Sequence, residues 1–164
     1  MDEFASRGYP VNEDMRFQRR SWVVERAGWL VLAAITLAGL SGIFGNGPAS
    51  WQRIAAGPLT VEYGRFQRAT RTSAFVFTIT AAEGAESVLR LGAPFQKAFE
   101  ISSIEPRPLR SSAGPDGLAL TFAAKAGAPS QIVIWARSRR YGLSAITAAA
   151  DGSAPLSSWV FVYP

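Results

Sequence analysis

The sequence predicts an all-β domain outside the membrane, an antiparallel β-sandwich or small barrel of about eight strands, with one N-terminal transmembrane α-helix before it. Residues 27–45 carry no charge, and a run of that length is typical of a membrane span. After residue 58, short alternating segments are separated by glycine, proline and aspartate, a pattern typical of strands joined by tight turns. The expected order is a cytoplasmic N-terminal tail (1–21), a transmembrane helix (22–46), a linker (47–57) and a periplasmic β domain (58–164).

The residue types in the chain exclude most common kinds of active site. Of the 164 residues, 48% are hydrophobic and 18% are charged, and there is no cysteine and no histidine. Disulfides, thiolate or imidazole metal sites and imidazole acid–base catalysis are therefore excluded. No G-x-S-x-G, phosphate-loop or EF-hand pattern occurs, and the spacing of the acidic residues demands no carboxylate pair. We expect a protein that is not an enzyme, with no catalytic residue, no metal and no cofactor.

The uncharged run fits a retained membrane anchor. As a helix it spans roughly 28 Å, close to the hydrocarbon core of about 30 Å. If the helix begins near Trp22, then Trp22 and Trp29 are interfacial aromatics, residues 46–48 end the helix, and Trp51 lies at the far interface. A soluble core helix would need a polar face, which the run lacks. A cleaved secretion signal is the main alternative, although its apolar region usually has about 7–15 residues and its charged segment is short.

Arginines near the two ends of the run predict its orientation. Five arginines precede it, and only Arg53 lies within about 15 residues after it. Because basic residues favour the cytoplasmic side, we expect the N-terminus in the cytoplasm and the β domain in the periplasm. The predicted location is the bacterial inner membrane.

Small residues form a stripe along the predicted span. Ala34, Ala38 and Gly42 repeat at intervals of four, with Ser41 and Gly45 beside them. Such a stripe lets a second helix approach closely. We interpret it as a packing face for a neighbouring membrane helix, although alanine and glycine are also common in spans without a partner.

Eight segments of the predicted β domain have the character of strands. They are residues 59–68, 73–82, 86–93, 99–108, 118–125, 130–138, 143–151 and 158–164. The turns between them, including Gly92-Ala93-Pro94, leave no room for a crossover helix, which excludes a parallel sheet. Pro106 and Pro108 cannot donate to a ladder, so we expect that part of the chain to lie at a sheet edge or to leave the sheet. The alternative is a polyproline stretch presented to a partner.

Three arginine clusters are the candidate contact sites. They contain Arg16, Arg19 and Arg20; Arg65, Arg68 and Arg71; and Arg137, Arg139 and Arg140. Arginine binds phosphates and carboxylates through its guanidinium fork, so we expect these residues, with Trp22, Trp29 and Trp51, to contact lipid or a partner. Each cluster also fits an ordinary solvated position, as a positive-inside flank, a strand end and a hairpin turn. Nucleic acid is disfavoured, because the charges are scattered rather than gathered in one run.

The order FQRRSWVVERAGW, an apolar span, GP and TVEYGRFQR resembles small uncharacterised bacterial membrane proteins with one span and an outer β domain. The resemblance implies a layout, and it implies no activity and no functional residue. By analogy, we expect a non-enzymatic accessory subunit that stabilises a larger bacterial membrane complex of the energy-transducing kind, photosynthetic or respiratory. Its partners would be integral membrane proteins and membrane lipids. The alternatives are a membrane-anchored periplasmic binding module and an envelope assembly factor.

Overall fold

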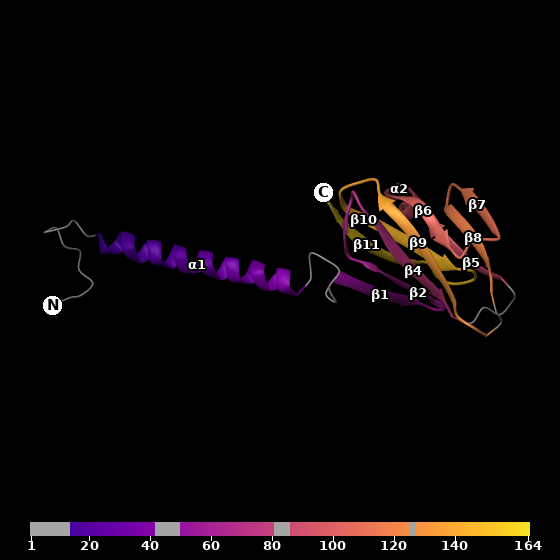
Figure 1. The fold of residues 1–164 in the computed structure, drawn as a ribbon, viewed down its shortest axis with the longest axis horizontal. Helices are drawn as coiled ribbons and strands as arrows, with labels where there is room; N and C mark the ends of the chain where they lie inside the picture. The colour runs from indigo at the N-terminus through magenta and orange to yellow at the C-terminus, as the bar shows by residue number, and fades with distance from the viewer. Residues whose placement is uncertain (1–13, 42–49, 81–85, 125–126) are drawn as a thin grey trace. The chain divides into compact units, whose positions relative to one another are not determined.

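The computed structural model describes residues 14–41, 50–80, 86–124 and 127–164. The chain separates into two compact units, Met1–Ser41 and Gly42–Pro164. The first contains one helix and the second contains all the strands (Figure 1). Each unit is described by itself.

Helix α1 (Met15–Leu40) forms the first unit. It begins at Met15 rather than near Trp22, because the Asp14 carboxylate caps it by accepting the backbone N–H groups of Arg16 (2.9 Å) and Phe17 (3.1 Å). None of its residues is buried. Among the described residues it is the one helix long and apolar enough to cross a membrane. Its predicted end at residue 46 lies outside the described residues.

The second unit is a β-sandwich of two sheets (Figure 1). The first sheet has the order β1-β2-β4-β9-β6 and the second β3-β11-β10-β5-β8-β7. The first contains β1 (Trp51–Ala56), β2 (Leu59–Gly64), β4 (Thr72–Ile79), β9 (Ser130–Ser138) and β6 (Phe99–Glu105). The second contains β3 (Phe66–Arg68), β11 (Leu156–Tyr163), β10 (Gly142–Ala150), β5 (Glu86–Gly92), β8 (Gly117–Ala123) and β7 (Arg110–Gly114). The predicted sandwich is thereby confirmed, with two sheets instead of a closed barrel.

All eight predicted segments form strands, and the described residues contain three more. Segment 59–68 divides into β2 and β3, because the chain leaves the first sheet after Gly64 and joins the second at Phe66. The expected linker 47–57 is wrong for residues 51–56, which form β1 and pair with β2. Gly57, at φ +57°, makes the tight turn between β1 and β2 that the sequence pattern did not reveal. Trp51 therefore belongs to the β domain.

Two features depart from a purely antiparallel sandwich. Strand β3 pairs with β11 in parallel, so the expected exclusion of parallel pairing fails at this edge. The expected turn Gly92-Ala93-Pro94 is instead the start of a short helix, α2 (Ala93–Ala98), which connects the two sheets. Proline is favourable in a first helical turn, where its missing N–H would have no partner.

Aromatic rings fill the centre of the sandwich. Phe75 is fully buried, and its ring centroid lies 5.9 Å from Tyr63, 5.2 Å from Phe95 and 5.1 Å from Phe99. These four residues come from β2, β4 and β6 of the first sheet and from α2, so α2 closes one side of the core. The core of the described residues lies wholly within the β domain.

The proline-rich segment lies where the sequence predicts. Strand β6 is at the edge of the first sheet, and it ends at Glu105, one residue before Pro106. Because proline has no backbone N–H, the ladder stops there. The expectation that this segment lies at an edge or leaves the sheet is confirmed.

Candidate functional site

One end of the β domain brings together residues that are far apart in the sequence. The described part of the domain begins there with Ser50 and Trp51, and Trp51 pairs with Gly64. At the same end, Thr72 at the start of β4 pairs with Arg137 near the end of β9. We refer to this end, with residues 65–71, which include β3, and the loop 139–141, as the linker end.

Six of the predicted contact arginines lie at the linker end, and all six are exposed. They are Arg65, Arg68, Arg71, Arg137, Arg139 and Arg140. Within the described ranges, Glu100 is the one carboxylate that forms an ion pair with any of them, at 3.7 Å from Arg137. Arg139 and Arg140 lie in the loop between β9 and β10. The predicted hairpin turn is wrong, because β9 belongs to the first sheet and β10 to the second, so this loop connects the two sheets. The linker end therefore carries a strong excess of positive charge.

Arg65, Arg68 and Arg71 at this end keep most of their donors available. Arg65 Nε donates to Gln52 Oε1 at 3.1 Å. Arg68 Nε donates to the main-chain oxygen of Pro164 at 3.4 Å. For the Arg71 side chain, no hydrogen bond or ion pair forms with any residue that the structure describes. Their terminal guanidinium nitrogens can therefore receive an anion.

Away from the linker end, two arginines are paired with close carboxylates. Arg90 pairs with Asp151 at 3.0 Å, and Arg110 pairs with Glu86. Exposed pairs of this kind add little stability, but they cancel the local charge. The positive potential of the domain is therefore concentrated at the linker end.

A hollow of about 610 Å³ opens at the linker end. Trp51 and Trp135 line it, and they remain 46% and 39% exposed. Trp51 lies opposite Gly64, and Trp135 lies opposite Ala74, on neighbouring strands of the first sheet. The two small residues leave space between the indoles. We refer to this hollow as the tryptophan groove; its wall also contains Phe66, Arg68, Arg71, Thr72 and Tyr163.

A buried hydroxyl joins the two sheets beneath the groove. The Tyr63 hydroxyl lies 3.0 Å from Gln52 Oε1 and 3.3 Å from the Trp159 main-chain oxygen, and it also hydrogen-bonds with Ser158 Oγ. Tyr63 is in the first sheet, and Ser158 and Trp159 are in the second. Burial raises the pKa of the Tyr63 phenol, while the Ser158 hydrogen bond and the Arg65 charge oppose the rise.

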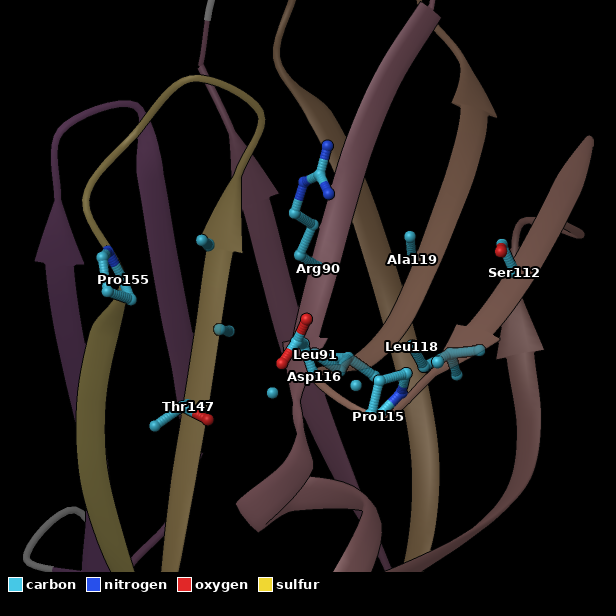
Figure 2. Close-up of a pocket in the computed structure, with 14 residues that line it drawn as sticks. Arg90, Leu91, Ser112, Pro115, Asp116, Leu118, Ala119, Thr147 and Pro155 are labelled. Atoms are coloured by element: carbon cyan, nitrogen blue, oxygen red, sulfur yellow. The ribbon is translucent and has the colours of Figure 1, made fainter.

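A second hollow of about 340 Å³ lies over the second sheet (Figure 2). Its floor is formed by small residues, including Gly92 and Gly117. The Thr147 hydroxyl is packed tightly against Gly92, because a Cβ built there would lie 2.0 Å from it. Arg90 lines this hollow but is already paired with Asp151. This second hollow therefore offers an anion fewer available donors than the tryptophan groove does.

The predicted helix-packing residues fall in two groups. Ala34, Ala38 and Ser41 are described, and Ser41 Oγ donates to the Ala38 main-chain oxygen at 2.7 Å. Gly42 and Gly45 lie outside the described residues. Whether this stripe packs against another helix stays a prediction.

The predicted contact residues of the N-terminal flank all lie in α1 with exposed side chains: Arg16, Arg19, Arg20, Trp22 and Trp29. The Arg26 guanidinium lies 4.5 Å from the centroid of the Trp22 ring, a cation–π contact. Arg26 is one of the five arginines that precede the uncharged run, and this contact places it beside a predicted interfacial tryptophan.

Sequence analysis also missed Trp135 and Tyr163, both in the groove, and Tyr63 beneath it. Ile132 and Ile134 are buried, and Trp135 is the next residue in the strand. Because successive side chains alternate between the two faces of a strand, the side chain of Trp135 lies on the outer face. Its neighbours on that face depend on strand register, which the sequence did not fix.

The residues of the site are suited to binding through charge, stacking and hydrogen bonds. No group of three or more His, Cys, Asp or Glu side chains that could hold a metal occurs in the described part of the chain. Guanidinium groups stay protonated, and indoles offer stacking surface and one donor each. This arrangement can bind an anion with an attached apolar or polar group.

No known protein family matches the chain, and no curated protein matches it. Among solved structures, a cohesin module from the Clostridium perfringens ATCC13124 family 33 glycoside hydrolase is similar, with a TM-score of 0.49 and 12% identity over 66% of this chain and 98% of that module. A similarity of this size carries no argument about function.

Proposed function

We propose that this chain is a membrane-anchored, non-enzymatic binding protein. In this proposal α1 holds the chain in the bacterial inner membrane, with the N-terminus in the cytoplasm and the β domain in the periplasm. The β domain binds another molecule in the tryptophan groove. The observation that carries the proposal is the groove itself, where two exposed tryptophans meet Arg71, whose side chain has no partner among the described residues.

The anchor is supported by the surface of α1. Its large apolar side chains from Phe17 to Leu40 are exposed, and none of its residues is buried by the chain. Apolar surface gains roughly 25 cal/mol per Å² when it leaves water, so a fully exposed apolar helix needs a non-aqueous surrounding. The arginines on its first turns support a cytoplasmic N-terminus. A cleaved signal remains the competing explanation for the same helix.

Binding at the groove is supported by its exposed tryptophans and by its volume. Exposed tryptophans that line one concavity are unusual on a soluble surface, and they mark binding sites when polar residues surround them. The groove volume of about 610 Å³ lies in the range typical of sites for small molecules, about 300–1,000 Å³.

A photo-crosslinking experiment in cells tests this proposal. Thr72 and Thr80 are both exposed and stand at opposite ends of β4, Thr72 in the groove and Thr80 away from it. Benzoylphenylalanine is introduced at one position or the other in the full-length chain. We expect a discrete cross-linked species from position 72 and none from position 80.

Equal patterns from both positions, or no product from position 72, contradict the groove as the binding site. Both threonines are exposed, Thr72 as the first residue of β4 and Thr80 as the residue after its last, so their difference isolates the position. The species itself, protein or lipid, is identified by mass spectrometry.

An accessory subunit of a larger bacterial membrane complex is the second candidate. The small residues Ala34 and Ala38 on α1 favour it, since they allow close helix packing. Gentle detergent extraction followed by sizing separates the two candidates. A fixed ratio within a large assembly supports the subunit, whereas migration alone at 17.6 kDa plus detergent contradicts it. No feature of the described residues selects a photosynthetic or respiratory complex. If the chain is instead an envelope assembly factor, its client binds transiently and would be detected only as a cross-linked species.

A further inference from the structure

We infer that the tryptophan groove binds the headgroup of an anionic phospholipid, with its phosphate held by Arg68 and Arg71. This inference rests on the proposed function, because it names the ligand of the same groove. The juxtaposition that carries it is two arginine forks and four aromatic rings around one hollow.

The first step is that the positive charge of Arg68 and Arg71 favours an anionic ligand. A phosphodiester carries one negative charge and accepts two parallel hydrogen bonds from a guanidinium group. Arg71 has no side-chain partner among the described residues, and Arg68 uses only its Nε, toward Pro164. The terminal nitrogens of both side chains are therefore available to a phosphate in the groove. The other arginines of the linker end repel a cationic headgroup and attract an anionic one.

The aromatic residues are the second step. Trp51, Trp135 and Tyr163 line the same hollow as the two arginines. Tryptophan and tyrosine favour the headgroup layer of membranes, where one part of the ring contacts apolar groups and another part contacts polar ones. A glycerol backbone with its ester groups has this mixed character.

The position of the groove in the chain is the third step. Ser50 and Trp51 belong to its wall, and nine residue steps separate Ser50 from Ser41 at the end of the described helix. A chain of that length extends at most about 32 Å. When α1 spans a membrane, the groove is tethered close to a dense layer of headgroups, and a tether of this length gives a high effective concentration. This favours lipid over a diffusing acidic peptide.

Titration of the full-length chain in a mild non-ionic detergent tests the inference. The probe is dihexanoyl-phosphatidylglycerol, followed by isothermal calorimetry. The comparison probes are dihexanoyl-phosphatidylcholine, which has the same phosphate but no net charge, inorganic phosphate, and an oligoglutamate peptide. We expect saturable binding of phosphatidylglycerol, about tenfold or more tighter than each comparison probe, since one charge-assisted contact is worth about a factor of ten.

Three variants locate the binding. Arg71→Gln removes one fork, and we expect its affinity for phosphatidylglycerol to fall about tenfold. Gly64→Leu fills the floor between the indoles; a Cβ at that position meets only the Phe66 main-chain oxygen, at 3.8 Å, so the fold tolerates it while the probe is excluded. Arg107→Gln is the matched control, because Arg107 is also exposed but lies in the connection between β6 and β7. It loses the same charge and should bind as the wild type does.

The outcomes separate the sources of the anion. If inorganic phosphate binds as tightly as phosphatidylglycerol does, the lipid inference is overturned in favour of a free anion. Tighter binding of oligoglutamate overturns it in favour of an acidic protein segment and leaves the proposed function standing. Equal losses in Arg71→Gln and Arg107→Gln overturn the groove as the site. No binding of any probe, with a position-72 cross-link to a protein, overturns the lipid inference alone.

Discussion

Removing the Tyr63 hydroxyl should loosen the contact between the two sheets at the linker end. Tyr63→Phe keeps the buried ring and its stacking on Phe75, at 5.9 Å between centroids. It removes the hydrogen bonds with Gln52, Ser158 and the Trp159 main-chain oxygen. The change is therefore confined to polar contacts.

The size of the effect follows from those contacts. A hydroxyl donates once and accepts twice at most, and a typical hydrogen bond contributes about 0.5–1.5 kcal/mol net. Gln52 Oε1 keeps its second donor, Arg65 Nε, at 3.1 Å, so it is not left unsatisfied. We expect a loss of about 1–2 kcal/mol, and for a domain of this size a fall in Tm of about 4–8 °C.

Thermal unfolding of the full-length protein in mild detergent, followed by circular dichroism of the β signal, measures this loss. Tyr141→Phe is the matched control, because Tyr141 is 68% exposed in the loop between β9 and β10, and its Tm should stay within about 2 °C. A Tyr63→Phe protein as stable as the wild type would refute the claim that this hydroxyl joins the sheets.

We expect the difference in Tm between the wild type and Tyr63→Phe to depend on pH. The pKa of Tyr63 is raised by burial in the folded state. The unfolded chain therefore ionises first, near pH 10, and wild-type stability falls as the pH rises above that value. Tyr63→Phe lacks this loss, so the difference in Tm between the two proteins should narrow above pH 10. A difference that is constant through this range contradicts the buried, neutral phenol.

Three further perturbations test the fold and the topology. Phe75→Ala removes the ring that packs on three others; we expect a loss of about 3–5 kcal/mol by thermal unfolding, and a loss under 1 kcal/mol would contradict a close-packed core. Gly117→Ala, at φ +138° with its Cβ 2.0 Å from a main-chain oxygen, should cost more than about 2 kcal/mol, whereas Gly114→Ala, with open space, should be tolerated; equal Tm values would disprove the close approach. Because the chain has no cysteine, a membrane-impermeant maleimide should label Thr80→Cys in intact cells but Ala5→Cys only after lysis, and the reverse would contradict a periplasmic β domain.

The strands that could be predicted from the sequence are those with strong alternation. Segments such as 73–82 and 130–138 place large apolar side chains at every second position, and that pattern has no other stable solution than a strand with one buried face. Strand β1 was missed because its two alanines weaken the pattern, and β7 because all its residues are exposed. Helix α2 was missed because it is short and its proline also fits a turn.

The candidate site could be predicted only in part. Arg68 and Arg71 were identified as an arginine cluster, and Trp51 as an exposed aromatic. Their meeting with Trp135 depends on the pairing of Ala74 with Trp135 in β4 and β9, and register between strands distant in sequence is set by the whole core rather than by local pattern. The expected role of Trp51 at the membrane interface stays a prediction, now for a residue of the β domain.

Whether α1 is retained as a membrane anchor for an outer binding domain can be read from the intact mass of the protein in washed membranes. Membranes are treated with alkaline carbonate, which releases peripheral and soluble proteins, and the pellet is measured by mass spectrometry. We expect a species near 17.6 kDa in the pellet, with α1 intact. A shorter chain that lacks α1 and leaves with the wash would contradict it and identify α1 as a cleaved signal.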